Sequence, residues 1–221
     1  MTLNKSLNIA LPKGRILESV LPILSKIGIE PEKSFFDSND RKLKFKTNIN
    51  NLNIIRVRSF DVVTFLAYGA AQMAFVGSDI LNEYNHTEVY SPIDLNVGNC
   101  KMVVAAEKYV ITNEDPRSWS HVRVATKYPN ITRKYFEARG VHAECIKLNG
   151  AMELAPSMGL CKRIVDLVET GSTLKANGLV EIEKICNVST RLAVNRSYWK
   201  TNLSTIQPWI DKVEEVINVK N

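Results

Sequence analysis

The chain has 221 residues, of which 45% are hydrophobic and 24% charged, and its formal net charge is +6. This composition describes an ordinary globular protein with room for one large domain or two compact lobes, and it excludes a mainly disordered chain. Lys and Arg are dispersed among Asp and Glu, and the aromatic residues are scattered, so the sequence argues against a nucleic-acid-binding module. Small phosphorylated ligands account for the basic excess equally well.

The N-terminal segment and the cysteines exclude further classes of protein. The apolar run before Lys13 is too short for a secretion signal or a membrane span, so we expect a cytoplasmic protein without a membrane partner. The four cysteines are widely spaced, without a Cys-x-x-Cys pair or a histidine at ligand spacing, so neither a disulfide framework nor a zinc site is indicated. The three histidines are isolated from any nucleophile turn, so a hydrolase triad finds no support.

Short apolar runs bounded by turn residues alternate with segments whose apolar residues recur every three or four positions. The first pattern is typical of buried strands and the second of helices, and their alternation predicts β-α-β units with mostly parallel strands. No internal repeat or flexible linker is present, so a second lobe would be joined by short crossings. In chain order we expect strands at 7–11, 52–57, 73–77, 101–107, 122–127, 141–148 and 163–169, and helices at 16–27, 62–66, 130–139, 151–159 and 206–217, the last with Pro208 near its start.

The segment RIVDLVETGSTLKANG, residues 163–178, carries the strongest local signal. An apolar strand leads into Glu169–Thr173, and a helix is expected directly afterwards. Gly171 can adopt positive φ, which lets successive backbone N–H groups converge on one anion. The segment therefore predicts a phosphate-binding loop, to which three hydroxyl side chains add donors: Thr170, Ser172 and Thr173.

Two carboxylates beside this loop fit a phosphorylated ribose. Asp166 and Glu169 can accept hydrogen bonds from vicinal ribose hydroxyls, and they can help to hold Mg²⁺ indirectly. The alternative is that the loop hydroxyls serve only as helix N-caps, which a strand-turn-helix junction requires without any ligand.

A second candidate for anion binding follows the first predicted strand, where Lys13, Gly14 and Arg15 precede a helix. In an open α/β sheet, ligands collect at the carboxyl ends of the strands. The two cations can meet phosphate groups, and Gly14 allows close approach. The alternative is a solvated turn at a helix start.

Three arginines extend this set. Arg56 and Arg58 lie two positions apart on one strand face, where a buried pair would need an anionic partner. Arg58 is nearer the strand end and is the better functional candidate, and Arg41 in the preceding segment is a further cation. The alternative is that these side chains are simply solvated.

The turn Gly77-Ser78-Asp79 follows another apolar strand. It predicts either an anion-binding helix start, with Gly77 and Asp79 as ligand residues, or an N-cap at Ser78 or Asp79. We favour the cap and keep Gly77 and Asp79 as candidate substrate-binding residues.

Segments spread over nearly the whole chain resemble the ATP phosphoribosyltransferases of histidine biosynthesis. The most specific is IVDLVETGSTL, which is similar to the phosphoribosyl-pyrophosphate loop of that family and occurs together with KGR near the N-terminus. In order, the segments are ALPKGRILES, RVRSFDV, the Gly77-Ser78-Asp79 turn, NCKMVVAA, ATKYPNITRKYF, GAMELAP and IVDLVETGSTLKANGL.

The resemblance implies an α/β fold of the two-lobed periplasmic-binding-protein type (type II). Lobe I would comprise residues 1–95 and 181–221, and lobe II, with the loop, residues 96–180. In the implied reaction, adenine N1 of ATP attacks 5-phosphoribosyl 1-pyrophosphate to give N1-(5-phosphoribosyl)-ATP and pyrophosphate, with Mg²⁺ on the pyrophosphate. The chain would thus be a glycosyltransferase of the pentosyltransferase kind.

The resemblance also implies roles for single residues. The 5-phosphate would bind to Thr170–Thr173 and the ribose hydroxyls to Asp166 or Glu169. The pyrophosphate charge would be met by four cations: Lys13, Arg15, Arg41 and Arg58.

The chain resembles the short form of the family, which lacks a C-terminal regulatory domain. Short forms work with a separate regulatory subunit similar to a histidyl-tRNA synthetase, usually in hetero-octamers. Local departures from the family pattern are Val63, Gln72 and the Cys161-Lys162 pair.

A different class of function fits the same fold. A non-catalytic, two-lobed small-molecule-binding protein would have the same architecture. The ETGSTL loop counts against this reading.

Overall fold

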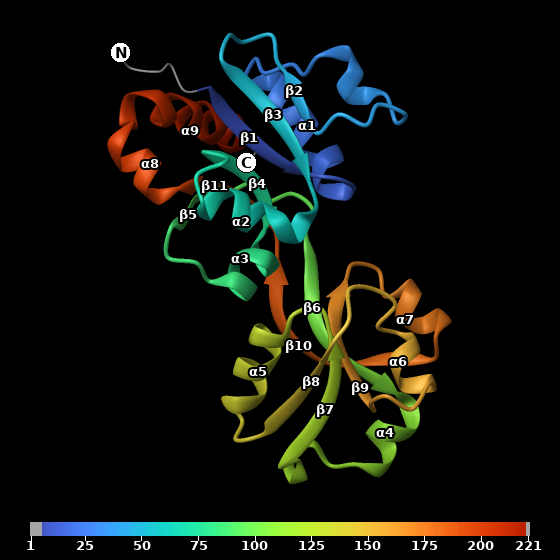
Figure 1. The fold of residues 1–221 in the computed structure, drawn as a ribbon. Coiled ribbons are helices and arrows are strands. Elements are labelled where there is room, and N and C mark those ends of the chain that lie inside the picture. The colour runs from blue at the N-terminus through green and yellow to red at the C-terminus, as the bar shows by residue number, and fades with distance from the viewer. Residues whose placement is uncertain (1–5, 220–221) are drawn as a thin grey trace. The chain divides into compact units, whose positions relative to one another are not determined.

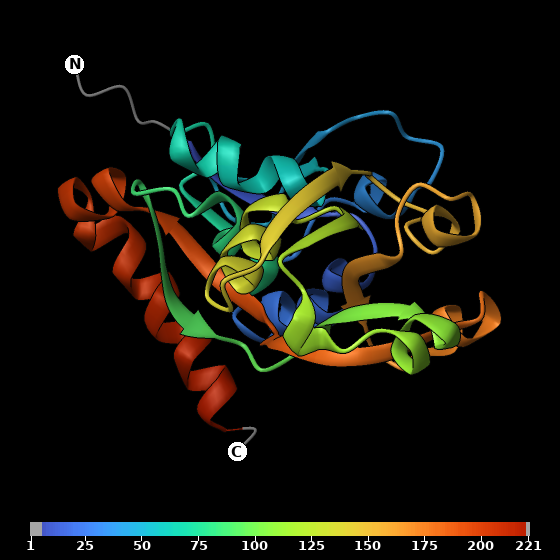
Figure 2. The ribbon, with the colours of Figure 1, turned by 90° about the horizontal axis from the view of Figure 1, so that it is seen from below.

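The computed structural model describes residues 6–219, whose strands form two separate sheets (Figures 1 and 2). The chain divides into two units: residues up to Gly98 with those from Ser189 onward, and Asn99–Val188. The sequence placed the crossings at 95/96 and 180/181. The second crossing lies further along the chain because residues 181–188 continue a strand of the second sheet.

The first unit contains a six-stranded sheet in the order β2-β3-β1-β4-β11-β5. Its strands are β1 (Leu7–Pro12), β2 (Lys44–Lys46), β3 (Leu52–Val57), β4 (Met73–Gly77), β5 (Val89–Asp94) and β11 (Thr190–Asn195). Its helices are α1 (Arg15–Lys26), α2 (Val62–Ala67), α3 (Ser78–Tyr84), α8 (Arg196–Thr201) and α9 (Leu203–Asn218), with short 3₁₀ turns η1 (Lys33–Phe36) and η2 (Ser59–Asp61).

Helices cover both faces of this sheet, and the central strand shows why. Ile9 of β1 packs in the core cluster that includes α1 and α9, whereas its neighbour Ala10 belongs to the cluster that includes α2 and α3. Successive strand residues point to opposite faces, and both side chains are fully buried. A strand buried on both faces reads as an uninterrupted apolar run, which is why the sequence revealed β4 and, after Asn8, β1.

The second unit contains a five-stranded sheet in the order β10-β6-β9-β7-β8. Its strands are β6 (Cys100–Glu107), β7 (His121–Thr126), β8 (His142–Lys147), β9 (Arg163–Val168) and β10 (Leu179–Val188). Its helices are α4 (Lys108–Asn113), α5 (Pro129–Glu137), α6 (Leu154–Ser157) and α7 (Ser172–Ala176), with the 3₁₀ turn η3 (Pro116–Ser118).

Each sheet contains three adjacent parallel strands, with antiparallel strands beside them. The pairs β1–β3, β1–β4, β7–β8 and β7–β9 are parallel. The strands β2, β11, β5, β6 and β10 pair antiparallel. The sequence predicted mostly parallel strands, and this prediction is wrong for the five antiparallel strands. The alternation of strands and helices in the sequence gave no sign of them.

Two helices also differ from the sequence prediction. The helix expected at 151–159 is only the short α6. Helix α9 begins at Leu203, so Pro208 lies inside it instead of near its start. None of the helices formed by residues 6–219 is long and apolar enough to cross a bilayer.

Candidate functional site

The second unit presents three strand ends at one edge of its sheet. Strands β7, β8 and β9 are parallel, so the residues that follow them emerge on the same side. The segment Glu169–Thr173 connects β9 to α7 at this edge. Because ligands of α/β sheets collect at the carboxyl ends of strands, this is the expected position for a binding loop.

Gly171 gives the loop its shape. Its φ of 77° and ψ of 4° place it in the left-handed region, as the sequence predicted. A Cβ there would meet nothing closer than 3.8 Å, namely Val168 Cγ1 and Glu181 Oε1. Glycine is therefore required by the backbone conformation and not by lack of space.

The hydroxyl side chains of the loop lie on the surface. Thr170, Ser172 and Thr173 are exposed, and Thr170 Oγ1 lies 3.0 Å from Ser172 Oγ. The N-cap of α7 is Gly171, without a side-chain capping hydrogen bond. The reading of these hydroxyls as N-caps is thus wrong, although Thr170 Oγ1 accepts a long hydrogen bond of 3.4 Å from Ser172 N.

The two carboxylates of the segment differ in exposure. Asp166 is half-buried, and its Oδ1 accepts a hydrogen bond of 2.8 Å from Leu167 N, whereas Glu169 is exposed. Within residues 6–219, no group of three or more His, Cys, Asp or Glu side chains could hold a metal ion.

The first unit brings its candidate residues together at the corresponding edge of its own sheet. The parallel register of β1 and β3 ends at Pro12 opposite Val57, so Lys13 and Arg58 are the next residues on adjacent strands. β4 lies on the other side of β1 and ends at Gly77. Residues far apart in the sequence thus meet at the carboxyl ends of three parallel strands.

Gly14 and Arg15 begin the helix that follows. Gly14 is the N-cap of α1, with φ of 88° and ψ of −151°, a conformation that glycine tolerates. Lys13, Gly14 and Arg15 are exposed. The N–H groups at the start of this helix and the two cations make the segment suitable for an anion.

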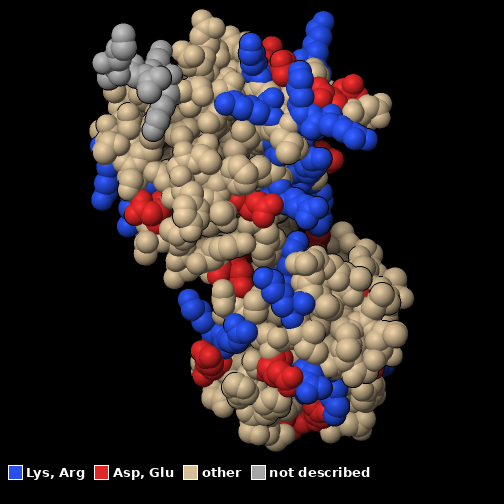
Figure 3. Space-filling view, in the orientation of Figure 1, with Lys and Arg blue, Asp and Glu red and all other residues tan. Residues whose placement is uncertain are grey.

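Arg41 belongs to the same end of the sheet. It is exposed in the loop before β2, and Leu43 O in that loop accepts a hydrogen bond of 2.7 Å from Arg56 N near the end of β3. Figure 3 shows Lys and Arg side chains gathered on the part of the first unit where Figure 1 places α1, β2 and β3.

Arg56 and Arg58 have different environments. Arg56 is half-buried, with its guanidinium carbon 4.5 Å from the ring centroid of Phe35 and 4.7 Å from that of Phe45. It donates a hydrogen bond to Phe35 O. Arg56 therefore has a structural role, whereas Arg58 is exposed after the strand.

The turn after β4 is built differently from the expected cap. The N-cap of α3 is Gly77, and Ser78 and Asp79 are the first two residues of the helix. A Cβ on Gly77 would overlap Asp79 Oδ1, so any side chain at this position would force the Asp79 carboxylate to move. Asp79 is buried, while Ser78 Oγ accepts a hydrogen bond of 3.2 Å from Ser189 N.

The family model described as HisG, ATP phosphoribosyltransferase, matches residues 58–215 of this chain. This match begins at Arg58 and spans the loop, all five strands of the second sheet and strands β4, β5 and β11 of the first. The chain belongs to the ATP phosphoribosyltransferase family. The resemblance drawn from the sequence segments is thereby confirmed.

Relatives in this family match over almost their whole length. The chain is 56% identical to the ATP phosphoribosyltransferase of Rhizorhabdus wittichii over 96% of each chain. It is 55% identical to that of Rhodospirillum rubrum, over 94% of this chain and 91% of that protein.

Solved structures support the fold. The ATP phosphoribosyl transferase (HisG:HisZ) complex from Thermotoga maritima contains a chain with a TM-score of 0.81 and 34% identity, covering 96% of this chain and 98% of that one. The VFT2 domain of BvgS from Bordetella pertussis matches with a TM-score of 0.56 at 14% identity, over 86% of this chain and 81% of that one. The chain has the two-lobed, type II periplasmic-binding-protein fold, and its likeness to the HisG:HisZ complex agrees with a short-form ATP phosphoribosyltransferase.

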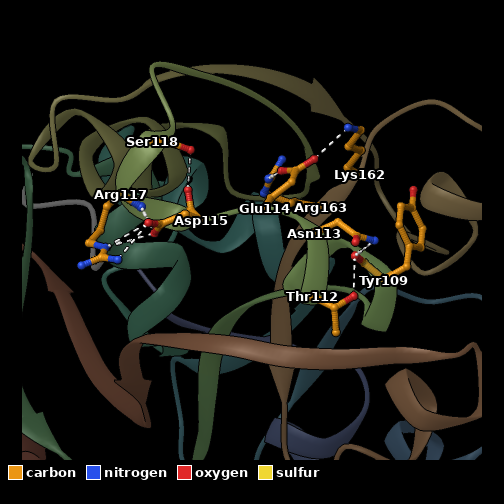
Figure 4. A network of polar contacts seen from close by, with 9 residues as sticks. All are labelled: Tyr109, Thr112, Asn113, Glu114, Asp115, Arg117, Ser118, Lys162 and Arg163. Carbon is orange, nitrogen blue, oxygen red and sulfur yellow. Dashed lines mark hydrogen bonds and ion pairs between the residues drawn. The ribbon is translucent and has the colours of Figure 1, made fainter.

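Two departures from the family pattern have structural partners. Gln72 is buried, accepts a hydrogen bond of 2.8 Å from Asn8 N and donates one of 2.9 Å to Gly69 O. Lys162 pairs at 2.7 Å with Glu114, which also binds Arg163 (Figure 4). This network lies at the start of β9, whereas the loop follows its end.

Sequence reasoning missed residues at the edge of the second unit. Thr126 ends β7 and is completely buried, and its Oγ1 accepts a hydrogen bond of 3.0 Å from Tyr128 N. It shapes the turn that neighbours the loop. The rule that polar residues after buried strands line the site would have identified it, because it applies to β7 as to β9.

Proposed function

We propose that this chain joins ATP to 5-phosphoribosyl 1-pyrophosphate, forming N1-(5-phosphoribosyl)-ATP and pyrophosphate in the first step of histidine biosynthesis. The observation that carries this proposal is the loop Glu169–Thr173. Its left-handed glycine and exposed hydroxyls lie at the carboxyl edge of a parallel strand set. Membership of the ATP phosphoribosyltransferase family supports the choice of reaction.

We assign the sugar phosphate to the loop. The 5-phosphate accepts hydrogen bonds from the backbone N–H groups and hydroxyls of Thr170–Thr173, as anions do in backbone nests. Asp166 and Glu169 accept hydrogen bonds from the ribose hydroxyls. Because both carboxylates belong to the same segment as the loop, the sugar is oriented by a single short stretch of chain.

The remaining phosphate charge is assigned to the cationic edge of the first unit. Lys13, Arg15, Arg41 and Arg58 are all exposed there. Guanidinium groups bind phosphate oxygens through two parallel hydrogen bonds, which fixes geometry as well as charge.

The chemistry needs no general base. Adenine N1 already has a free electron pair near neutral pH, and it forms a bond to the anomeric carbon of the ribose. The bond from that carbon to the pyrophosphate oxygen breaks, and its electron pair leaves with pyrophosphate. Alignment of the two substrates and stabilisation of the leaving charge then supply the rate enhancement.

Mg²⁺ fits this arrangement as a companion of the substrate. Mg²⁺ is commonly bound by one or two carboxylates together with substrate phosphates and water, and it would neutralise pyrophosphate charge. Asp166 and Glu169 are the carboxylates of the loop segment that can take part. Their position agrees with a metal ion carried by the substrate.

We further propose that the chain works in the cytoplasm with a HisZ-like regulatory subunit, similar to a histidyl-tRNA synthetase, in a hetero-octamer. The likeness to a chain from the HisG:HisZ complex of Thermotoga maritima supports the partner. The stoichiometry of eight subunits is an expectation from the family.

Pyrophosphate release by the purified chain tests the reaction. ATP, 5-phosphoribosyl 1-pyrophosphate and Mg²⁺ are supplied together, and each substrate is supplied alone as a control. We expect release only with both substrates, alone or after addition of the HisZ-like subunit. Binding of either substrate without release under both conditions would instead favour a non-catalytic small-molecule-binding protein.

A further inference from the structure

Side chains from three strands converge on Gly171 in the second unit. Val168 Cγ1 at the end of β9 and Glu181 Oε1 on β10 are both 3.8 Å from the position of a Cβ on Gly171. Lys101 Nζ on β6 lies 2.6 Å from Glu181 Oε2. An ion pair thus lies against the loop to which the sugar phosphate is assigned.

The strand register explains why this lysine reaches the loop. Lys101 is paired with Val168 in the antiparallel ladder of β6 and β9. Residues directly opposite one another in such a ladder point to the same face of the sheet. Lys101 therefore shares the face on which Val168 packs with Leu174 of α7, directly beneath the loop.

The charge at this position needs compensation. A carboxylate within a few ångströms of a phosphate site repels the phosphate, and the Lys101 ammonium neutralises Glu181 there. The side chains of Lys101 and Glu181 are 37% and 35% exposed, so the pair is in contact with solvent and can exchange one of its partners. An exposed pair of this kind contributes little to folding stability, which makes a role in binding testable without unfolding the protein.

We propose that Lys101 is a substrate-binding residue for the phosphorylated ribose and that Glu181 is the positioning residue that holds its ammonium beside Gly171. This inference rests on the proposed function, because it concerns the same loop. The phosphate of the ligand takes up one or two of the three ammonium hydrogens, while Glu181 retains another. The proposal also gives a function to the segment NCKMVVAA, which contains Lys101 and to which the sequence analysis assigned no role.

The test measures binding of ribose 5-phosphate and of 5-phosphoribosyl 1-pyrophosphate by calorimetry to the full chain. Lys101→Met removes the charge, and Lys101→Arg retains it. The control is Arg123→Met, because Arg123 Nε makes a comparable exposed pair at 2.9 Å with Glu144 between β7 and β8. Thermal unfolding of each variant verifies that it is folded.

For Lys101→Met we expect a Kd about tenfold higher or more for both ligands, because one charge-assisted hydrogen bond to the phosphate is lost. Lys101→Arg should stay within about threefold of the wild type, because it keeps the positive charge. A purely structural role of the lysine stem would instead leave the affinity of Lys101→Met unchanged, since methionine keeps an unbranched stem. In turnover assays, KM for the phosphoribosyl substrate should rise for Lys101→Met with kcat and KM for ATP little changed. The double variant Lys101→Met/Glu181→Gln should recover part of the affinity, because the uncompensated carboxylate is gone.

Two results would overturn the inference while leaving the proposed function intact: wild-type affinity in Lys101→Met, or equal losses in Lys101→Met and Arg123→Met. The second would show a general charge effect in place of a local contact. If the wild-type chain binds neither ligand, the inference and the assignment of the loop fall together.

Discussion

At the scale of single residues, Gly171 is required because of its backbone conformation, although the space around it would admit a side chain. Its φ of 77° strains any residue with a Cβ, although a Cβ would have no close contact there. The left-handed region costs a non-glycine residue roughly 1–2 kcal/mol, and more if the residue is β-branched. We therefore expect Gly171→Val to abolish measurable binding of 5-phosphoribosyl 1-pyrophosphate in calorimetry, because the loop amides no longer converge.

Gly140 provides a matched control for that substitution. It has φ of 73° and open space around its Cβ position, and it lies between α5 and β8. The Gly140→Val variant should lose about as much free energy of unfolding as Gly171→Val, but it should keep the wild-type affinity for 5-phosphoribosyl 1-pyrophosphate. Wild-type affinity in Gly171→Val, or an equal loss in both variants, would contradict the loop assignment.

Arg58 is the residue on which the cationic edge of the first unit is tested. It is exposed, so truncation should leave the fold intact, and it should lower kcat at least tenfold, which corresponds to about 1.4 kcal/mol of barrier. Arg117→Ala is a suitable control because its side chain is 91% exposed on the second unit and pairs with Asp115. Unchanged kcat at saturating substrate in Arg58→Ala would remove this arginine from the mechanism.

Local sequence patterns predicted the environment of some of these residues and not of others. The spacing of Arg56 and Arg58 predicted a shared face, and position at the strand end favoured Arg58 as the functional candidate. In the structure Arg58 is exposed and Arg56 is half-buried. The partners of Arg56, two phenylalanine rings and a backbone carbonyl, come from other segments and could not be read locally. The same holds for Gly77, where the space for a side chain depends on the position of the Asp79 carboxylate.

At the scale of elements, an acidic bridge joins the end of α4 to the start of β9 (Figure 4). Glu114 accepts a hydrogen bond of 2.7 Å from Lys162 and pairs with Arg163, whose side chain is only 5% exposed and stacks 3.9 Å from the Trp119 ring centroid. The hydrogen bond from Lys162 and the charge of Arg163 hold the pKa of Glu114 below its ordinary value.

A lowered folded-state pKa means that the ionised carboxylate stabilises the fold. This contribution is present above the unfolded pKa of about 4.3 and is lost as pH falls through the lower folded value. Glu114→Gln should therefore reduce the free energy of unfolding at pH 7 by about 1–3 kcal/mol, because the buried Arg163 loses its charged partner. Denaturant unfolding at several pH values measures this, and the difference between wild type and variant should shrink below roughly pH 4. A difference that is constant down to pH 3 would contradict the ionic contribution.

Strands with a clear apolar run bounded by turn residues were predictable, whereas β2, β5, β10 and β11 were not predicted. Strands β3 and β4 occupy the residues expected from their apolar runs. Strand β10 was missed because it carries mostly half-buried and exposed residues over ten positions, interrupted by register shifts. The three-residue β2 has a single buried side chain, Phe45, which is too short a pattern to recognise.

At the scale of the whole molecule, the order of segments identified the family and the fold, and the sequence approximated the division into two units. The crossing at Ser189 was placed too early because the pattern gave no sign that one continuous strand extends to Val188. The site could be assigned from the sequence to strand ends, since parallel strands deliver their carboxyl ends to one edge. Side-chain partners such as Lys101 and Glu181 needed the sheet order, which places β6 between β9 and β10.

The net charge of +6 and the cations gathered on the first unit (Figure 3) predict that ionic strength controls substrate capture. Raising ionic strength from about 0.01 M to about 0.15 M shortens the screening length from about 30 Å to about 8 Å. Both substrates are polyanions, so KM for each should rise at least about threefold over this range, while kcat, which reports on bound substrate, should change less than about twofold. Steady-state pyrophosphate release at constant free Mg²⁺ measures both constants, with sucrose at matched osmolarity as the control. A KM that does not depend on salt would mean that the cations of the first unit do not contribute to capturing the substrates, and their assignment to the phosphate groups would then have to be withdrawn.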